Sequence, residues 1–206
     1  MLSQSVASAL REAISAGEFQ PGERLSEVKA AERFNCSRNT LRESFTRLAA
    51  ERIVERIPNR GVFLAMPDAD YIRDLFAARA AIEPAAVRWG AFADAPSLVT
   101  LTSSAFDYAA RGEHQEVSAI NQRFHRTLVA ALGSPTLNEQ MDNLLARMRL
   151  TFLLAIPRYP QLHADHIQGN ITLATLIADG KRDEAATLTH DSLMNTCGKI
   201  LAVLED

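Results

Sequence analysis

The chain has few of the features that mark secreted, membrane-spanning or metal-binding proteins. Its 206 residues include 2 cysteines, Cys36 and Cys197, whose positions match neither a disulfide framework nor a metal-binding motif. No apolar run reaches the length of about 18 residues that a membrane-spanning helix requires. Residues 1–4 also lack the basic and apolar parts of a signal peptide. We therefore expect a cytoplasmic protein with reduced cysteines and no membrane partner.

Residues 26–61 carry the most informative local pattern in the chain. Ser37 is a candidate N-cap for a helix over residues 37–50, because its hydroxyl can accept a hydrogen bond from a backbone N–H near Thr40. Apolar residues recur in this segment at i, i+4 and i+7, which is the spacing of one helix face. The pattern predicts a helix that buries Leu41, Phe45 and Leu48.

A second helix is expected just before this one, over residues 27–34. Its apolar positions predict that Val28, Ala31 and Phe34 contribute to the same core. The two helices would then form a compact pair joined by a tight turn.

A β-hairpin is expected after the helix pair. Residues 53–57 and 62–64 are rich in strand-forming residues and flank a turn at residues 58–61. The order of two helices followed by a hairpin predicts a winged helix-turn-helix. Arg60 and Gly61 lie at the tip of the predicted wing, where they can reach the minor groove or its phosphates.

The polar side of the predicted 37–50 helix carries groups suited to DNA. Arginine can bind guanine or a phosphate with two hydrogen bonds, and asparagine can pair with adenine. The sequence does not separate base reading from backbone contact, and an ordinary solvated face is the alternative. The predicted DNA contacts are Arg24, Ser37, Arg38, Asn39, Thr40, Arg42, Arg47, Arg60 and Gly61.

The charge is divided unevenly along the chain. The formal net charge is −3. Residues 1–66 hold 10 Lys and Arg against 8 Asp and Glu, a net +2, whereas residues 67–206 hold 12 against 17, a net −5. The positive charge is therefore local to the predicted DNA-binding part. Because this excess is small, we expect binding to DNA to depend on a dimer.

Residues 5–64 resemble the N-terminal domain of the GntR family of bacterial transcription regulators. The family's Ile-x-x-Gly, Pro-Gly-x-x-Leu-x-Glu and Ser-Arg-x-x-Leu-Arg-Glu segments are matched at residues 14–17, 21–27 and 37–43. The resemblance implies that Arg38 and Arg42 bind operator DNA.

Three residues depart from the pattern of that family. Asn35 and Arg52 stand where glycine is usual, and Asn39 stands where threonine is frequent. These departures bear on the operator sequence more than on the activity.

The remainder of the chain predicts helices only. Apolar periodicity and breaks at glycine and proline predict six helices, which form an all-α bundle. The fold class is therefore mainly α, with a winged helix-turn-helix domain over residues 1–66 and a helical domain over residues 67–206. The predicted helices span residues 68–92, 95–111, 114–132, 135–155, 160–179 and 182–204.

The helical part resembles the FCD domain, the ligand-sensing domain of the FadR subfamily of GntR regulators. The matching segments are Arg79-x-x-x-Glu83, residues 121–125, the break at residues 133–135 and Gly180 before an alanine-rich last helix. The resemblance implies a homodimer that senses a small organic acid.

Many FCD domains hold a divalent metal, so the resemblance also implies a zinc-like site. Asn121 and His125 match the first ligand pair of the family, four residues apart on one helix. The other two ligands are usually histidines, but here the matching positions are Asn170 and Ser192. His166 and His190 are the nearby substitutes, although His190 and Ser192 lie on different sides of a helix. We expect that His125 instead forms hydrogen bonds inside a polar pocket or the core.

Without a metal, polar side chains would have to bind the effector directly. We expect Asn121, His125, Asn170 and Ser192 to form this polar set. An arginine flanked by apolar residues can grip a carboxylate with two hydrogen bonds. Arg79 and either Arg147 or Arg149 fit this description, and Arg149 is preferred. The alternative for Arg79 is an ion pair with Glu83, one turn along the helix.

These features predict a regulator of transcription that binds a palindromic operator as a homodimer. A small carboxylate effector would change the spacing of the two recognition helices. We expect the protein to be a repressor that its effector releases from DNA, more often than an activator. An all-α hydrolase or lyase that uses His125, or a metal-dependent sensor, is the alternative. The sequence has no nucleophile elbow, phosphate loop or HExxH motif, so we predict no enzymatic activity.

Overall fold

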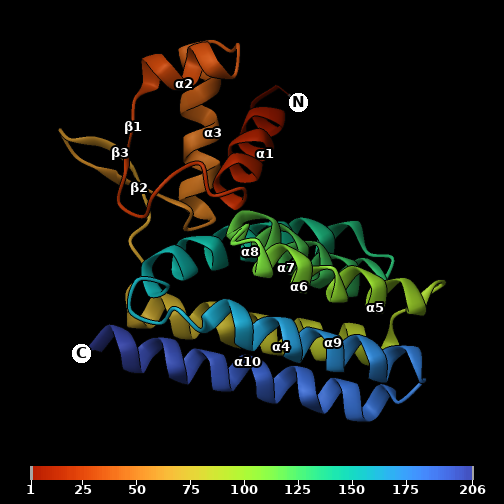
Figure 1. The fold of residues 1–206 in the computed structure, drawn as a ribbon. Helices are drawn as coiled ribbons and strands as arrows, with labels where there is room; N and C mark the ends of the chain where they lie inside the picture. Colours follow the sequence, from red (N-terminus) through yellow and green to blue (C-terminus); the bar gives the residue numbers. More distant parts are fainter. Residues whose placement is uncertain (1, 206) are drawn as a thin grey trace. The chain divides into compact units, whose positions relative to one another are not determined.

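The computed structural model describes residues 2–205, and of Leu2 and His163 it describes the backbone alone. The chain divides into two compact units (Figure 1). The first contains residues up to 68 and also residues 143–154, and the second contains residues 69–142 and the chain from residue 155 onward. No helix within residues 2–205 has the length and hydrophobicity needed to cross a membrane.

The first unit begins with three helices and three short strands. The helices are α1 (Leu2–Ser15), α2 (Glu27–Arg33) and α3 (Arg38–Ala50), and the strands are β1 (Arg24–Leu25), β2 (Val54–Ile57) and β3 (Gly61–Leu64). The sheet is antiparallel with the order β1-β3-β2. The winged helix-turn-helix is therefore confirmed. The third strand, β1, was not predicted, because it has only two residues and shows no strand pattern in the sequence.

The rear face of α3 forms the core of this unit. Leu41, Phe45 and Leu48 are completely buried, and so are Leu10 and Ile14 of α1, which packs against α3. An ion pair reinforces this packing, because Nη2 of Arg11 lies 2.7 Å from a carboxylate oxygen of Glu51. The predicted apolar stripe is therefore the face that holds α3 in place.

The prediction for α2 was partly wrong. Ala30 is the buried residue of this helix, whereas Val28 is 46% exposed. Val28 instead lines an open groove between α2 and the beginning of α3. The helix has only seven residues, so a small rotation about its axis is enough to exchange the buried position.

Two of the departures from the family pattern occupy special backbone positions. Asn35 has a φ of 45° and Arg52 has a φ of 59°, values in the left-handed region where glycine carries no steric cost. Asparagine tolerates this region better than most residues. The backbone turns that glycine makes elsewhere in the family are therefore kept here by other residues.

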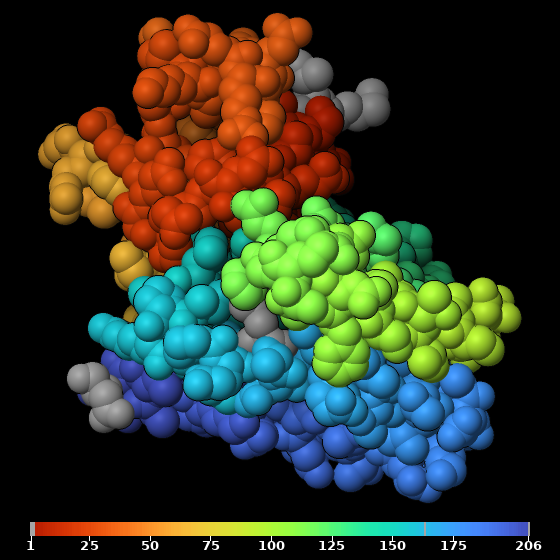
Figure 2. All heavy atoms as spheres, in the orientation of Figure 1, coloured from red at the N-terminus to blue at the C-terminus, as the bar shows by residue number. Residues whose placement is uncertain are grey.

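The second unit is helical throughout the described residues. Its helices are α4 (Ala69–Trp89), α5 (Ala95–Ser103), α6 (Ala105–Ala110), α7 (His114–Ala130), α8 (Pro135–Ala155), α9 (Leu162–Ala178) and α10 (Arg182–Glu205). Residues 143–154 of α8 are grouped with the first unit. Helix α10 lies along α4 (Figure 1), and its side chains form the lower edge of this unit in Figure 2.

These seven helices replace the six that the sequence predicted. The segment predicted as one helix over residues 95–111 is divided at Ser104 into α5 and α6. The Ser104 hydroxyl donates a hydrogen bond of 2.7 Å to the carbonyl of Leu101, and serine side chains that bond to nearby carbonyls disturb helices. The break lacks the glycine or proline that marks the other boundaries, so the pattern did not reveal it.

The helix cap at Ser37 generates a stability prediction. Its hydroxyl accepts a hydrogen bond of 3.1 Å from the backbone N–H of Thr40, so Ser37→Ala should lower the free energy of unfolding by about 1 kcal/mol. Ser37→Asp should retain the stability, since aspartate caps equally well. Urea unfolding of the three proteins measures this difference, and equal midpoints for Ser37→Ala and the wild type would contradict it.

Candidate functional site

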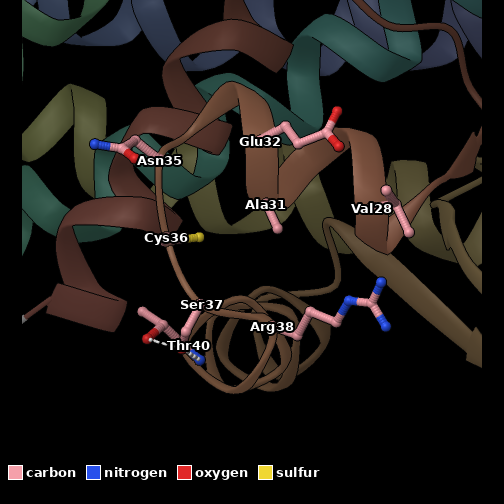
Figure 3. A pocket seen from close by; sticks show the side chains of 8 residues that line it. All are labelled: Val28, Ala31, Glu32, Asn35, Cys36, Ser37, Arg38 and Thr40. Carbon is pink, nitrogen blue, oxygen red and sulfur yellow. Dashed lines mark hydrogen bonds between the residues drawn. The ribbon is translucent and has the colours of Figure 1, made fainter.

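The N-terminal end of α3 presents a group of exposed polar side chains. Ser37 and Thr40 share a hydrogen bond of 2.8 Å between their hydroxyls, which fixes both side chains at the first turn. Arg38 and Asn39 are exposed, and Arg38 extends away from the Ser37–Thr40 pair (Figure 3). Among the described residues, no carboxylate lies within ion-pair distance of Arg38. Its guanidinium is therefore available for a ligand from solution.

Arg42 lies one turn farther along α3 and is held by an acidic partner. Its Nε donates to both carboxylate oxygens of Glu27, at 3.2 and 3.1 Å. This hydrogen bond, together with the charge of Glu27, raises the pKa of Arg42. Arg56 of β2 donates a hydrogen bond of 2.7 Å to the carbonyl of Arg42. Arg42 is thus pre-oriented, and an incoming phosphate has to compete with Glu27 for it.

The wing places two of the predicted arginines near each other. Arg24 on β1 pairs with Phe63 on β3, and the guanidinium of Arg60 lies 5.6 Å from the centre of the Phe63 ring. Gly61 has a φ of 113°, and a Cβ added there would lie 3.4 Å from Nε of Arg24. The strand pairing therefore brings Arg24 to the wing, although it is 36 residues before Arg60 in the sequence.

Arg47 stands apart from these groups. It is exposed in the last turn of α3, about 15 Å along the helix axis from Ser37. Arg47 therefore does not belong to the group of side chains at the first turn of α3.

The interior of the second unit contains a buried ionic cluster. Glu83 of α4 is completely buried, and Arg79 and His125 are also buried. Nε of Arg79 donates to one carboxylate oxygen of Glu83, and Nδ1 of His125 lies 2.6 Å from the other. The Arg79–Glu83 ion pair that the sequence left as an alternative is therefore present, and His125 is its third member.

The charge state of Glu83 fixes the role of the histidine. Burial raises the pKa of the Glu83 carboxyl, but the charges of Arg79 and His125 and the hydrogen bonds from both lower it, so that it falls from 4.5 to about 2. An ionised carboxylate can only accept hydrogen bonds. Nδ1 of His125 therefore carries a proton, and Nε2 is the ring nitrogen left for other contacts.

An amide pair lies on the same helix as His125. Asn121 is one turn before His125 on α7 and is buried, and its Oδ1 accepts a hydrogen bond of 2.7 Å from Nδ2 of Asn170 on α9. Asn121, His125 and Asn170 thus form a polar interior built from α7 and α9. This bond uses the oxygen of Asn121 and the nitrogen of Asn170, so the amide protons of Asn121 and the Oδ1 of Asn170 take no part in it.

Ser192 was wrongly expected to be buried with this set. It is exposed on α10, where the neighbouring buried residues are Thr189 and Leu193. The sequence prediction counted along α10 from Gly180. Because the sequence does not show which side of α10 faces the interior, this count placed Ser192 on the buried side. Thr189 is the polar residue that α10 buries, and the sequence gave no signal that singled it out.

Comparison with known proteins adds the family. A model of the bacterial regulatory proteins of the gntR family matches residues 2–64, and a model of the FCD domain matches residues 74–195. The chain belongs to the GntR family and carries an FCD domain. It is thus a regulator of transcription, with a DNA-binding domain followed by a ligand-sensing domain in the FadR-like arrangement.

Individual relatives agree with this assignment. The chain is 27% identical over 189 residues to the Nta operon transcriptional regulator of Aminobacter aminovorans, covering 90% of this chain and 88% of the relative. It is 28% identical over 160 residues to the Galactonate operon transcriptional repressor of Escherichia coli (strain K12), covering 66% and 69%. A crystal structure of a putative transcriptional regulator GntR from Rhodococcus sp. RHA1 is 29% identical, with a TM-score of 0.82 and 97% of each chain covered.

The FCD domain implies a metal, which the described residues do not fit. Among the described side chains, no three from His, Cys, Asp and Glu are grouped closely enough to hold an ion. His190 is exposed on α10 beside Asp191, and His166 is half-buried on α9. The interior thus offers one imidazole and two neutral amides, and zinc-like ions prefer several imidazoles, thiolates or carboxylates.

Arg149 has a different environment from the one expected. It is buried and grouped with the first unit, where its guanidinium lies against the backbone of Gly17. Gly17 has a φ of 80°, and a Cβ added there would lie 2.8 Å from Nε of Arg149. Burial lowers the pKa of Arg149. The structure therefore gives Arg149 a packing role at the end of α1, and Arg147 is likewise buried.

The buried cluster generates a prediction on stability and its pH dependence. Glu83→Gln leaves the buried charge of Arg79 without a counter-charge, so it should lower the free energy of unfolding by about 3–5 kcal/mol at neutral pH. The folded-state pKa of Glu83 lies below its unfolded value, so its contribution is present above about pH 4.5 and is lost as the pH falls toward 2. Urea unfolding at several pH values should show the two proteins converging on acidification.

Glu113→Gln is the matched control for this experiment. Glu113 pairs with Arg111, and both side chains are exposed, so its loss should cost less than about 1 kcal/mol. Equal effects of the two substitutions would contradict the assigned role of Glu83.

Proposed function

We propose that this regulator represses transcription by binding a palindromic operator as a homodimer, and that a small organic acid bound in the FCD domain releases it. The repressor role and the acid are supported by the relative named for a galactonate operon, since galactonate is a sugar acid. The homodimer is supported by the geometry of DNA, because two half-sites on a palindrome require two recognition helices at fixed spacing.

The exposed donors at the first turn of α3 support this proposal most strongly. Ser37, Arg38, Asn39 and Arg42 are carried by a helix whose opposite face is completely buried. Their positions are therefore fixed relative to the core, which is what reading of a base sequence requires. Arg24 and Arg60 extend the positive surface to the wing.

The effector is proposed to bind without a metal. Nε2 of His125, the amide protons of Asn121 and the Oδ1 of Asn170 supply both donors and acceptors, which suits an acid that also carries hydroxyl groups. Binding changes the operator affinity only as far as the acid prefers one arrangement of the dimer, commonly by 1–3 kcal/mol. The proposed effector binds through non-covalent contacts alone.

Arg38→Ala tests the DNA contact. The loss of an arginine at the first turn of the recognition helix should weaken binding of an operator fragment, recovered from genomic DNA by the wild-type protein, by roughly tenfold or more. Arg111→Ala, which removes an exposed arginine of the second unit, should change the affinity by less than twofold. Fluorescence anisotropy gives the affinities, and equal binding by Arg38→Ala and the wild type would reject the proposed interface.

The effector site is tested by thermal unfolding of chelator-treated protein with a panel of sugar acids and dicarboxylic acids. We expect at least one acid to raise the melting temperature without added zinc, and Asn170→Ala to remove this effect. Ser192→Ala serves as the control, because Ser192 is exposed, and it should respond as the wild type does. Stabilisation that requires zinc would overturn the metal-free proposal.

A further inference from the structure

Val28 is an exposed apolar side chain of the DNA-binding unit. It lies in the first turn of α2 and is 46% exposed. A single exposed valine is common on protein surfaces and carries no meaning by itself. Val28 differs because it lines the open groove between α2 and the beginning of α3, and Arg38 lines the same groove. The position of the groove therefore decides what Val28 can contact.

The first turn of α2 is fixed beside the polar face of α3. Glu27, which precedes Val28, pairs with Arg42 of α3, with 3.0 Å between Oε2 and Nη2. Figure 3 shows the side chain of Val28 on the same side of the groove as the guanidinium of Arg38. In a helix-turn-helix, the second helix enters the major groove while the first crosses the DNA backbone. A helix pair docked in this way carries Val28 to the edge of the major groove, beside Arg38.

The wall of the groove around Val28 is apolar. Ala31 and Cys36 are half-buried and, like Val28, offer carbon and sulfur surface. The side chain of Val28 has no strong hydrogen-bonding group, so it cannot bind a phosphate or the polar edge of a base. Glu32 follows Val28 by one turn in the same groove, and its negative charge repels a phosphate. The groove thus favours an apolar group of the DNA.

Thymine carries an apolar group in the major groove of B-DNA. This group is its C5 methyl, whereas the other three bases present hydrogen-bond donors and acceptors there. The sugars also offer C–H groups, but these groups lie next to the phosphates that Glu32 repels. An apolar side chain at the edge of the major groove is therefore complementary to thymine more than to the other three bases.

We propose that Val28 contacts the C5 methyl of a thymine and thereby specifies thymine at one position of each operator half-site, beside the position that Arg38 contacts. The inference rests on the proposed function, in which the first turn of α3 reads bases. None of the DNA contacts predicted from the sequence lies on α2, which spans Glu27–Arg33. The inference therefore adds a second helix to the recognition of the operator.

Replacement of thymine by uracil tests this contact, because uracil lacks only the C5 methyl. Each thymine of one half-site is replaced in turn in the operator fragment recovered by the wild-type protein, and fluorescence anisotropy gives the affinities. At one position the replacement should weaken binding by the wild type about fourfold, which corresponds to the burial of one methyl group. For Val28→Ala the same replacement should change the affinity by less than about 1.5-fold, because the contact is already absent.

Met66→Ala is the matched control for Val28→Ala. Met66 is a 51% exposed apolar residue of the same unit and is not part of the groove lining, so Met66→Ala should respond to uracil as the wild type does. Val28→Ala should fold as the wild type does, since the valine is exposed and alanine has the higher helix propensity. Urea unfolding of both variants measures their stability.

Selection of binding sites from random DNA gives a second measurement. Val28→Ala should enrich a half-site that keeps its other positions but accepts any base where the wild type selects thymine. Enrichment of the same thymine by Val28→Ala and by the wild type would overturn the proposal.

The uracil experiment separates this inference from the proposed function. A loss of affinity in Val28→Ala with an unchanged response to uracil would overturn the inference and indicate packing against the sugars. A wild type that is insensitive to uracil at every position, or a half-site without thymine, would also overturn it. These results would leave the proposed function standing as long as Arg38→Ala weakens binding. A wild-type protein that binds no DNA sequence specifically would reject both.

Discussion

A carboxylate that has no access to water governs the interior of the sensing domain. Leaving the charge of Glu83 buried and unpaired would cost several kcal/mol, so the fold must supply partners, and it does so with Arg79 one turn away and His125 on α7. Rotating or sliding α7 against α4 would break the hydrogen bond between His125 and Glu83. The hydrogen bond between Glu83 and His125 therefore sets the position of His125 and, through α7, that of Asn121.

This arrangement also decides how His125 can act. Its Nδ1 is committed to Glu83, which leaves Nε2 to interact with a ligand. In a metal site the same pairing would orient the imidazole toward the ion. Here the accompanying side chains are the amides of Asn121 and Asn170, which bond to each other. The hydrogen bond that orients the imidazole is thus present, and the side chains beside it are neutral amides.

The sequence predicted local features well and rotations of whole helices poorly. Ser37, Leu41 and Phe45 were placed correctly, because a cap and a 3.6-residue period depend on neighbours only a few positions away. Val28 and Ser192 were misplaced because the rotation of α2 and α10 is set by what packs against them.

In the candidate sites, too, contacts between residues close in sequence were predicted and contacts between distant residues were not. The Arg79–Glu83 pair was visible at a spacing of four residues, but the contact of His125 with Glu83 joins residues 42 positions apart. The short strand β1 and the environment of Arg149 likewise depend on distant segments. A single sequence contains no periodicity that reports such contacts.

Selection of binding sites from a pool of random double-stranded DNA is the most direct measurement on this protein. If the first turn of α3 reads bases and the protein acts as a two-fold dimer, repeated selection should enrich an inverted repeat whose half-sites are about one helical turn apart or a multiple of it. The enriched sequence should be lost from the pool when Arg38→Ala replaces the wild type. Retention of DNA without any enriched sequence, or no retention at physiological salt, would contradict the assignment of α3 as a sequence-reading helix.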